Sequence, residues 1–194
     1  MICGPVLWDK YWMNPPNLTE LYNRAWSYLV AGVKGQSTAR LVVLASVDPS
    51  GQPEARSVVL RSADPAQSRL EFHTDVDSQK VTSLHHMPRA QIHVWDPTDH
   101  VQLRLDVQVA LRQDDYASEQ WKKVPGPSQI AYGKTPSTGR VIPGPFAYET
   151  TSSQENFVVA DCLVRTIDYL CLDGPHFRAV FKASDGWKGA WLSP

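Results

Sequence analysis

The chain has 194 residues, of which 42% are hydrophobic and 20% charged, so it can bury the core of one domain, and we expect residues 1–194 to form it. Nineteen Lys and Arg against twenty Asp and Glu leave a net charge of -1, which offers no broad attraction for nucleic acid. No apolar run approaches the roughly 20 residues of a membrane-spanning helix.

Cysteine usage and the N-terminal sequence predict where the protein works. Its three cysteines are widely spaced, with no Cys-x-x-Cys pair, which fits a reducing compartment. The first residues lack a basic region followed by an apolar stretch, the pattern of an export signal. We therefore expect a cytoplasmic protein with no nucleic-acid partner and no membrane partner.

Hydrophobic periodicity and turn residues predict the elements in chain order. Apolar residues recur every three or four positions in the first helix, which Asn17 or Thr19 could cap and Gly32 or Gly35 could end. Later segments alternate apolar and polar residues and stop at turn sequences. The predicted elements are a helix at 14–34, strands at 41–47, 54–61 and 69–74, a helix at 78–86, strands at 90–95 and 101–111, a helix at 114–123, a long irregular loop at 125–154, and strands at 157–172, 177–182 and 187–192.

This order favours one fold class. The predicted strands are joined mostly by tight turns, whereas a parallel sheet would need a helix after nearly every strand. We therefore expect a mainly β protein, a closed or split antiparallel barrel with peripheral helices. The loop at 125–154 is rich in Pro, Gly, Ser and Thr, and a loop of that length is typically functional.

Cations and hydroxyls at the ends of predicted strands indicate a phosphate site. Arg56 and Lys80 could neutralise a phosphate monoester, and Thr74 and Ser78 add hydroxyl donors. The backbone N–H groups at the predicted helix start near Ser78 favour an anion as well. Regular alternation places Arg61 on the opposite face of its strand from Arg56 unless a bulge intervenes, so Arg61 is better placed for a second ligand.

Residue types alone leave alternatives open. Each of these side chains could be an ordinary surface cation or strand-end hydroxyl. Six histidines show no ligand spacing with an acidic or cysteine partner, so no metal site is expected. No Gly-x-Ser-x-Gly sequence is present, which argues against a hydrolase of that type.

The motifs, taken in order, resemble the FMN-binding split-barrel family of pyridoxine (pyridoxamine) 5'-phosphate oxidases. That family has a strand Arg-x-Val-Leu-Leu-Lys, then Phe-Tyr-Thr-Asn-x-x-Ser-Arg-Lys, a helix, Asn-Pro-Arg, a strand ending in Trp and a strand bearing Gln. This chain has RSVVLR, FHTDVDSQK, HHMPRAQIHVW and VQLRL at nearly the same spacing. The similarity is close over about 41–95 and looser through SQIAYG to the C-terminal WLSP.

The resemblance implies FMN as the cofactor, held at the interface of a homodimer. His73 stands where the family has Tyr, and Gln79 where it has Arg, so one phosphate-side cation is missing. Gln102 matches a glutamine that contacts the flavin ring, while Ser137 and Thr138 fall near a pair that reaches the cofactor from the partner subunit. The implied cofactor residues are Arg56, Ser57, Val58, Val59, His73, Thr74, Ser78, Gln79, Lys80, Gln102, Ser137 and Thr138.

The substrate side departs further from the family. Four residues that hold the substrate phosphate in the oxidases correspond here to Arg61, Gln120, Val124 and Ser128, so two of the four are lost. Losing an Arg that meets a phosphate costs on the order of 1.5–3 kcal/mol for a charge-assisted bond. Arg61 and Ser128 remain as predicted substrate-binding residues for an unidentified small molecule.

The C-terminal end carries the candidate catalytic residues. The family's Arg-x-His pair is replaced by His176-Phe177-Arg178, in reverse order, and Leu170 replaces a Trp beside the flavin. We assign proton transfer to His176, and attraction of an anionic group to Arg178 together with Arg61. The expected function is that of an FMN-dependent oxidoreductase of unassigned substrate. The alternatives are a flavin carrier or sensor, a true pyridoxamine 5'-phosphate oxidase, and a haem-binding relative of the same barrel.

Overall fold

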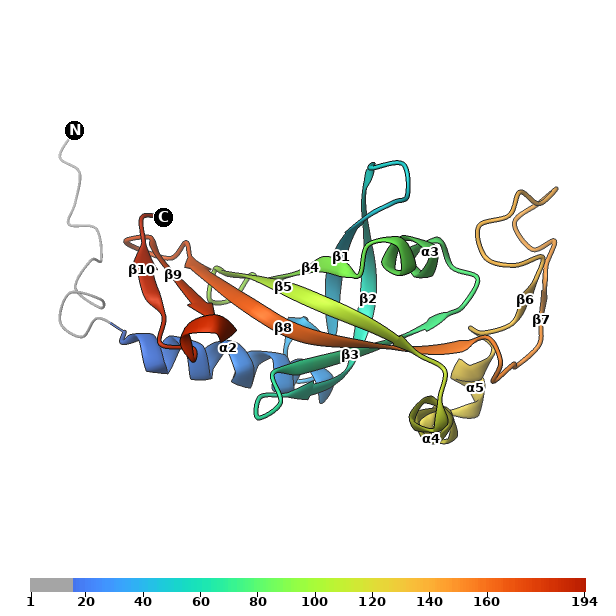
Figure 1. Ribbon diagram of the computed structural model, residues 1–194, viewed down its shortest axis with the longest axis horizontal. Helices are drawn as coiled ribbons and strands as arrows, with labels where there is room; N and C mark the ends of the chain where they lie inside the picture. The colour runs from blue at the N-terminus through green and yellow to red at the C-terminus, as the bar shows by residue number, and fades with distance from the viewer. Residues whose placement is uncertain (1–15) are drawn as a thin grey trace.

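A closed antiparallel barrel organises the chain in the computed structural model, which describes residues 16–194 (Figure 1). Its main sheet has the strand order β10-β9-β8-β3-β2-β1-β4-β5, and β5 pairs with β8 as well, so the six strands from β8 to β5 form a closed ring. The strands are β1 (Leu41–Val47), β2 (Pro53–Asp64), β3 (Arg69–Asp75), β4 (Arg89–Asp96), β5 (Val101–Arg112), β8 (Phe157–Cys171), β9 (Phe177–Lys182) and β10 (Ala190–Leu192). The predicted mainly β, split-barrel fold is confirmed.

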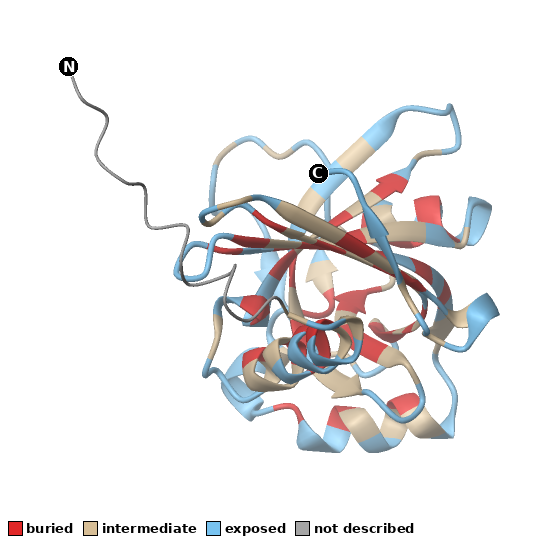
Figure 2. Ribbon diagram, turned by 90° about the vertical axis from the view of Figure 1, so that its left-hand side faces the viewer, coloured by how far each residue is buried: buried red, intermediate tan, exposed pale blue. Residues whose placement is uncertain are grey.

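Strand alternation fills the interior of the barrel. In β5, Leu103, Leu105 and Val107 are buried, and the residues between them face outward. β8 spans 15 residues and pairs with β3, β5 and β9, so it joins the barrel to its C-terminal extension. Figure 2 shows the buried residues concentrated along the central strands, with further ones in the helices.

Helices lie around the barrel, as expected, and a local side-chain cap starts the first of them. The first described helix begins at Leu18, where Asn17 accepts a hydrogen bond from the Glu20 amide (2.9 Å) and Glu20 accepts one from the Asn17 amide (3.3 Å). Asn17, not Thr19, is therefore the cap, and positions 14 and 15 of the predicted helix lie outside the described residues. The helices are α2 (Leu18–Val33), α3 (Gln79–His86), α4 (Asp115–Lys123) and α5 (Gly126–Gln129), with short 3₁₀ turns at Thr38–Arg40 and Ala183–Asp185.

The predicted loop at 125–154 is partly ordered, which corrects the sequence-based expectation. It contains α5 and a two-stranded hairpin of β6 (Lys134–Thr135) and β7 (Glu149–Thr150), which projects at one end of the molecule (Figure 1). The Gly133 amide donates to Asp75 Oδ2 at 2.8 Å and ties this segment to the end of β3. This contact joins residues far apart in the chain, and composition alone cannot predict it.

Other boundaries differ by a few residues. The predicted strand at 187–192 is shortened to β10, because Trp187 takes a left-handed backbone conformation (φ 64°) in the turn after β9. Within residues 16–194, no helix combines the length and apolar character needed to cross a bilayer. Cys162 and Cys171 are buried free thiols, and Cys3 lies outside the described part of the chain.

Candidate functional site

Two hydroxyls and an ammonium group meet where β3 ends and α3 begins. The Lys80 Nζ donates to Thr74 Oγ1 at 3.0 Å, and Thr74 Oγ1 lies 3.0 Å from Ser78 Oγ. Ser78 is the N-cap residue of α3 but makes no side-chain capping bond; its hydroxyl donates to the Asp75 carbonyl at 2.8 Å. The first turn of α3 and the three side chains therefore face a common point, which we call the β3–α3 corner (Thr74, Ser78 and Lys80).

Lys80 carries a charge that its surroundings compensate poorly. Across residues 16–194, no carboxylate lies within ion-pair distance of Lys80. Burial lowers the pKa of Lys80 and the Arg56 guanidinium lowers it further, whereas Asp75 and Glu54 raise it. A bound anion would supply the missing negative charge.

Arg56 lies nearby but is engaged within the protein. It donates to Glu54 Oε2 at 2.7 Å and to Ser46 Oγ at 2.6 Å, and Glu54 also accepts from Ser83 of α3 at 2.7 Å. The β1–β2 register places Ser46 opposite Glu54, so the pairing of the strands brings these two partners of Arg56 together. The charge of Arg56 is thus already paired with a carboxylate.

A β-bulge sets the direction of Arg61. Leu60 pairs with Phe72 and Ser62 with Glu71, so Arg61 is an extra residue in β2. Arg61 lines the same cavity as Lys80, whereas Arg56 lies outside its lining, so the two arginines do not meet at one point. Burial lowers the pKa of His73, as does the Arg61 guanidinium, to about 4, so the imidazole is neutral at neutral pH.

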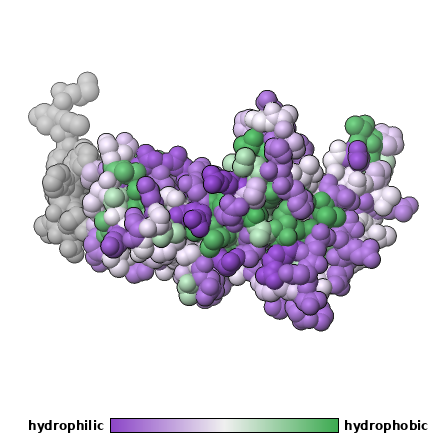
Figure 3. Space-filling view, in the orientation of Figure 1, coloured by the Kyte–Doolittle hydropathy of each residue, from purple (hydrophilic) through white to green (hydrophobic). Residues whose placement is uncertain are grey.

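The corner opens into a cavity of about 330 Å³. It has an apolar wall from β2 and a cationic side formed by Arg61, Lys80 and Lys134. Figure 3 shows an apolar area near the middle of the molecule, bordered by hydrophilic residues. The predicted cofactor residues that line the cavity are Ser57, Val58, Val59, His73, Thr74, Ser78, Lys80 and Thr138; Asp75, Ala131, Tyr132 and Lys134 also line it, although sequence reasoning did not single them out.

An aromatic cluster supports the cavity from behind. Phe157 lies edge-on to His73 (4.8 Å between ring centroids) and to Tyr132 (5.0 Å), and Trp121 lies 5.3 Å from Phe157. Val124 is buried in the same cluster. The Val124 side chain therefore serves packing, and it offers no donor to a substrate phosphate.

The remaining predicted residues lie elsewhere. Arg56, Gln79 and Ser137 are outside the cavity lining, and Ser128 is exposed on α5. Gln102, Leu170 and Arg178 form one row across β5, β8 and β9, with His176 exposed in the turn before β9. Leu170 lies eleven residues along β8 from Val159, which pairs with His73 of the cavity. At about 3.3 Å per residue, the row that contains Leu170 is roughly 35 Å from His73 along the strand.

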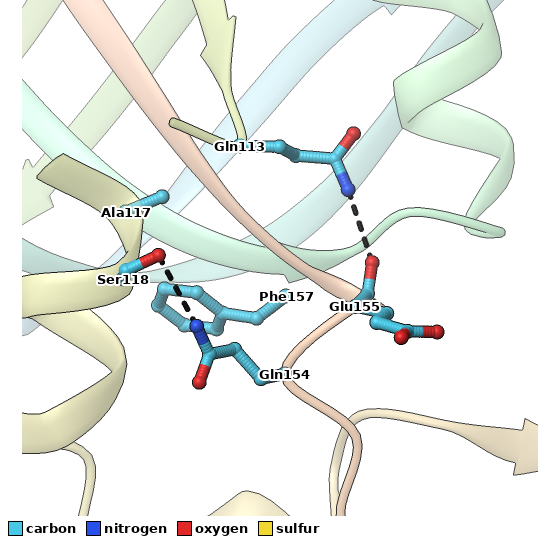
Figure 4. A pocket seen from close by; sticks show the side chains of 6 residues that line it. All are labelled: Gln113, Ala117, Ser118, Gln154, Glu155 and Phe157. Carbon is cyan, nitrogen blue, oxygen red and sulfur yellow. Dashed lines mark hydrogen bonds between the residues drawn. The ribbon is translucent and has the colours of Figure 1, made fainter. Parts of the chain in front are cut away.

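A second cavity, of about 400 Å³, lies beyond Phe157 (Figure 4). Gln113 Nε2 donates to the Glu155 carbonyl at 3.0 Å, and Gln154 Nε2 donates to Ser118 Oγ at 3.1 Å. These bonds hold the start of β8 against α4. Its lining residues carry no positive charge, so this cavity does not match the anion chemistry of the β3–α3 corner.

The closed barrel and its basic corner define a split-barrel protein. Residues 22–112, from α2 to β5, match the family described as pyridoxamine 5'-phosphate oxidase, FMN-binding domain. The family that the motifs resemble is thus the one whose model matches these residues.

Solved structures share the fold across most of the chain. A pyridoxamine 5'-phosphate oxidase-related, FMN-binding protein from Nostoc punctiforme is 22% identical, with a TM-score of 0.72 over 89% of this chain and 97% of that one. PhzG from Burkholderia lata, solved with tetrahydrophenazine-1-carboxylic acid, is 17% identical, with a TM-score of 0.67 over 97% and 98%. At these identities the likeness establishes the fold. No curated protein matches the chain.

Proposed function

We propose that the protein binds FMN through its phosphate at the β3–α3 corner and uses it for oxidoreductase chemistry on a small molecule. The observation that carries the proposal is the poorly compensated Lys80 ammonium, which points with two hydroxyls to the start of α3. A terminal phosphate matches this donor set, because it brings close to two negative charges and several acceptor oxygens.

The residues present fit the phosphate end of FMN. Thr74, Ser78 and Lys80 supply donors, and Val58 and Val59 supply an apolar wall. The cavity of about 330 Å³ is at the small end of the range for ligand sites. We infer that it takes the phosphate and the chain that carries it, while the ring extends beyond it.

The ring end calls for a second copy of the chain. Gln102, which the resemblance assigns to the flavin ring, lies in the row at the far end of β8 from the cavity. One chain cannot bring both groups to one flavin, whereas a symmetric pair could bring the row of one copy to the cavity of the other. The proposal therefore includes a homodimer with the cofactor at its interface.

When bound, FMN would accept and donate the electrons, and the protein would bind, orient and shield it. Lys80 would balance the phosphate charge. His73, neutral at neutral pH, would add no charge and could exchange a hydrogen bond through either ring nitrogen. Val124 is packed in the aromatic cluster, so pyridoxamine 5'-phosphate is not the favoured substrate.

The test starts with the ligand that copurifies with the full chain. Absorption bands of flavin, together with the mass of FMN after denaturation, are the expected result. Chemical reduction should bleach those bands, and air should restore them. A Soret band, or an apoprotein that takes up neither FMN nor another flavin, would overturn the proposal. Rapid oxygen consumption with pyridoxamine 5'-phosphate would refute the substrate argument alone.

A further inference from the structure

Two arginines converge on one carboxylate on the outer face of the barrel. Arg178 donates to Asp168 through Nε (3.0 Å) and Nη2 (2.7 Å), and Arg104 donates to Asp168 through Nη2 (2.5 Å). Arg104 lies opposite Asp168 in the β5–β8 register, and Arg178 reaches it diagonally from β9. We call Arg104, Asp168 and Arg178 the arginine pair site.

The carboxylate lies beneath the two guanidinium groups. The Asp168 side chain is 13% exposed, whereas those of Arg104 and Arg178 are 35% and 28% exposed. Burial raises the pKa of Asp168, but the hydrogen bonds from Arg178 and Arg104 outweigh it, so this pKa lies below its usual value and the carboxylate is charged at neutral pH. Two positive charges thus face one negative charge, which leaves the group with a net charge of about +1.

Donors remain for a ligand. Arg104 Nε is buried and has no hydrogen-bond partner among the described residues. Arg178 uses Nε and Nη2 on Asp168, so its Nη1 keeps two N–H donors in a partly exposed position. A buried donor without a partner costs free energy, which an accepting ligand would recover.

The neighbouring rows of the sheet hold one carboxylate, which is already hydrogen-bonded, and one further cation. The adjacent row of the sheet contains Asp106, which accepts a hydrogen bond from Gln91 at 2.9 Å, and Lys182, another cation. On the other side lie Gln102 and Leu170. A ligand would therefore meet an aliphatic side chain, two guanidinium groups, and the Gln102 amide, which lies 3.2 Å from the His93 imidazole.

We propose that Arg104 and Arg178, anchored by Asp168, bind the anionic group of a small organic substrate, a carboxylate or a phosphate monoester. Arg104 and Asp168 thereby become site residues alongside Arg178. That this anion belongs to a substrate rests on the proposed flavin function, because the site adjoins Gln102. That an anion binds here does not depend on the flavin function. The arginine pair site would bind the anionic group of the substrate, a role for which Val124, packed among aromatic rings, is unsuited.

The experiment reads the site directly in the full chain, freed of any flavin. The Arg104 Nε–Hε resonance is identified in a ¹⁵N correlation spectrum by its absence in R104K. Titration with benzoate, and separately with inorganic phosphate, should shift that resonance saturably, and the stronger of the two probes names the anion. R178M should weaken the binding about tenfold or more, the loss of one charge-assisted hydrogen bond.

The matched control is Arg112 at the end of β5, which also donates through Nε and Nη2 to a carboxylate, Asp114 Oδ2, at 3.0 and 2.8 Å. R112M should leave the binding unchanged, and so should K80M, which separates this site from the β3–α3 corner. R178K retains the charge and guards against misfolding: its spectrum should stay dispersed while the binding weakens.

The remaining outcomes each refute one part of the proposal. If neither probe shifts the Arg104 resonance at their solubility limits, or if R178M binds as well as the unmodified chain, the anion site is refuted. If R178M instead dissociates a dimer without affecting the probes, the group is an interface ion pair. If the probes bind but leave the absorption spectrum of loaded FMN unchanged, the assignment to a flavin substrate is wrong, although FMN binding itself stands.

Discussion

Replacing Lys80 by Met tests the phosphate corner most directly. Lys80 Nζ lies 3.0 Å from Thr74 Oγ1 and has no carboxylate within ion-pair distance in residues 16–194, so in the complex its charge would go to the phosphate. Losing one charge-assisted hydrogen bond costs about 1.5–3 kcal/mol, which corresponds to a dissociation constant about 10 to 150 times higher. Riboflavin lacks the phosphate, so its affinity should not change.

The assay is quenching of flavin fluorescence, with FMN and riboflavin titrated in parallel. Lys122→Met is the control, because Lys122 is exposed in an ion pair with Glu119 on α4. Burial and Arg56 already lower the pKa of Lys80, so its charge does not stabilise the fold, and K80M should unfold at the same or a higher denaturant concentration. Unchanged FMN affinity, or an equal loss for riboflavin, would refute the reasoning.

Three further predictions concern stability. Tyr116→Phe removes a 2.7 Å hydrogen bond to the buried Glu71 and should lower the free energy of unfolding in urea by about 1–3 kcal/mol. The pKa of Tyr116 is raised to about 12, so the unmodified protein should lose stability between pH 10 and 12, and the variant should not. The pKa of His73 is lowered to about 4, so its side chain stays neutral in the folded protein, whereas in the unfolded chain it takes up a proton below about pH 6.5. The free energy of unfolding should therefore fall from about pH 6.5 towards pH 4, and fall less in H73Q. Identical pH profiles for the two proteins would contradict this. Gly133→Ala should cost at least about 1–2 kcal/mol, because φ is 83° and an added Cβ would lie 2.4 Å from the Thr151 carbonyl oxygen; thermal unfolding at unchanged temperature would argue otherwise.

Local signals predicted the elements well. The cap at Asn17 and the alternation of β5 depend on near neighbours, and both are present in the structure. Thr74, Ser78 and Lys80 follow one another across a single strand-to-helix junction, so the sequence alone could place them together. Predictions of this kind succeed because the residues concerned share one turn or one strand.

Contacts between residues far apart in the chain set the features that the sequence did not predict. The bulge at Arg61 exists only because β2 and β3 pair with a shift, and Arg178 is oriented by Asp168, whose position depends on the β8–β9 register. Lys134 enters the cavity because Gly133 is bonded to Asp75. No local pattern reports such contacts.

The charges at the corner explain why one lysine should matter so much. Gln79 stands where the resemblance places an arginine, and the charge of Arg56 is already paired with Glu54. In the cavity, Lys134 donates to the Ala131 carbonyl, and Arg61 lies beside His73 rather than at the start of α3. Within residues 16–194, Lys80 is thus the cation at the β3–α3 corner that remains for an anion. Phosphate affinity there should therefore depend on salt as a contact with one cation does, and a site served by three cations would show a steeper dependence.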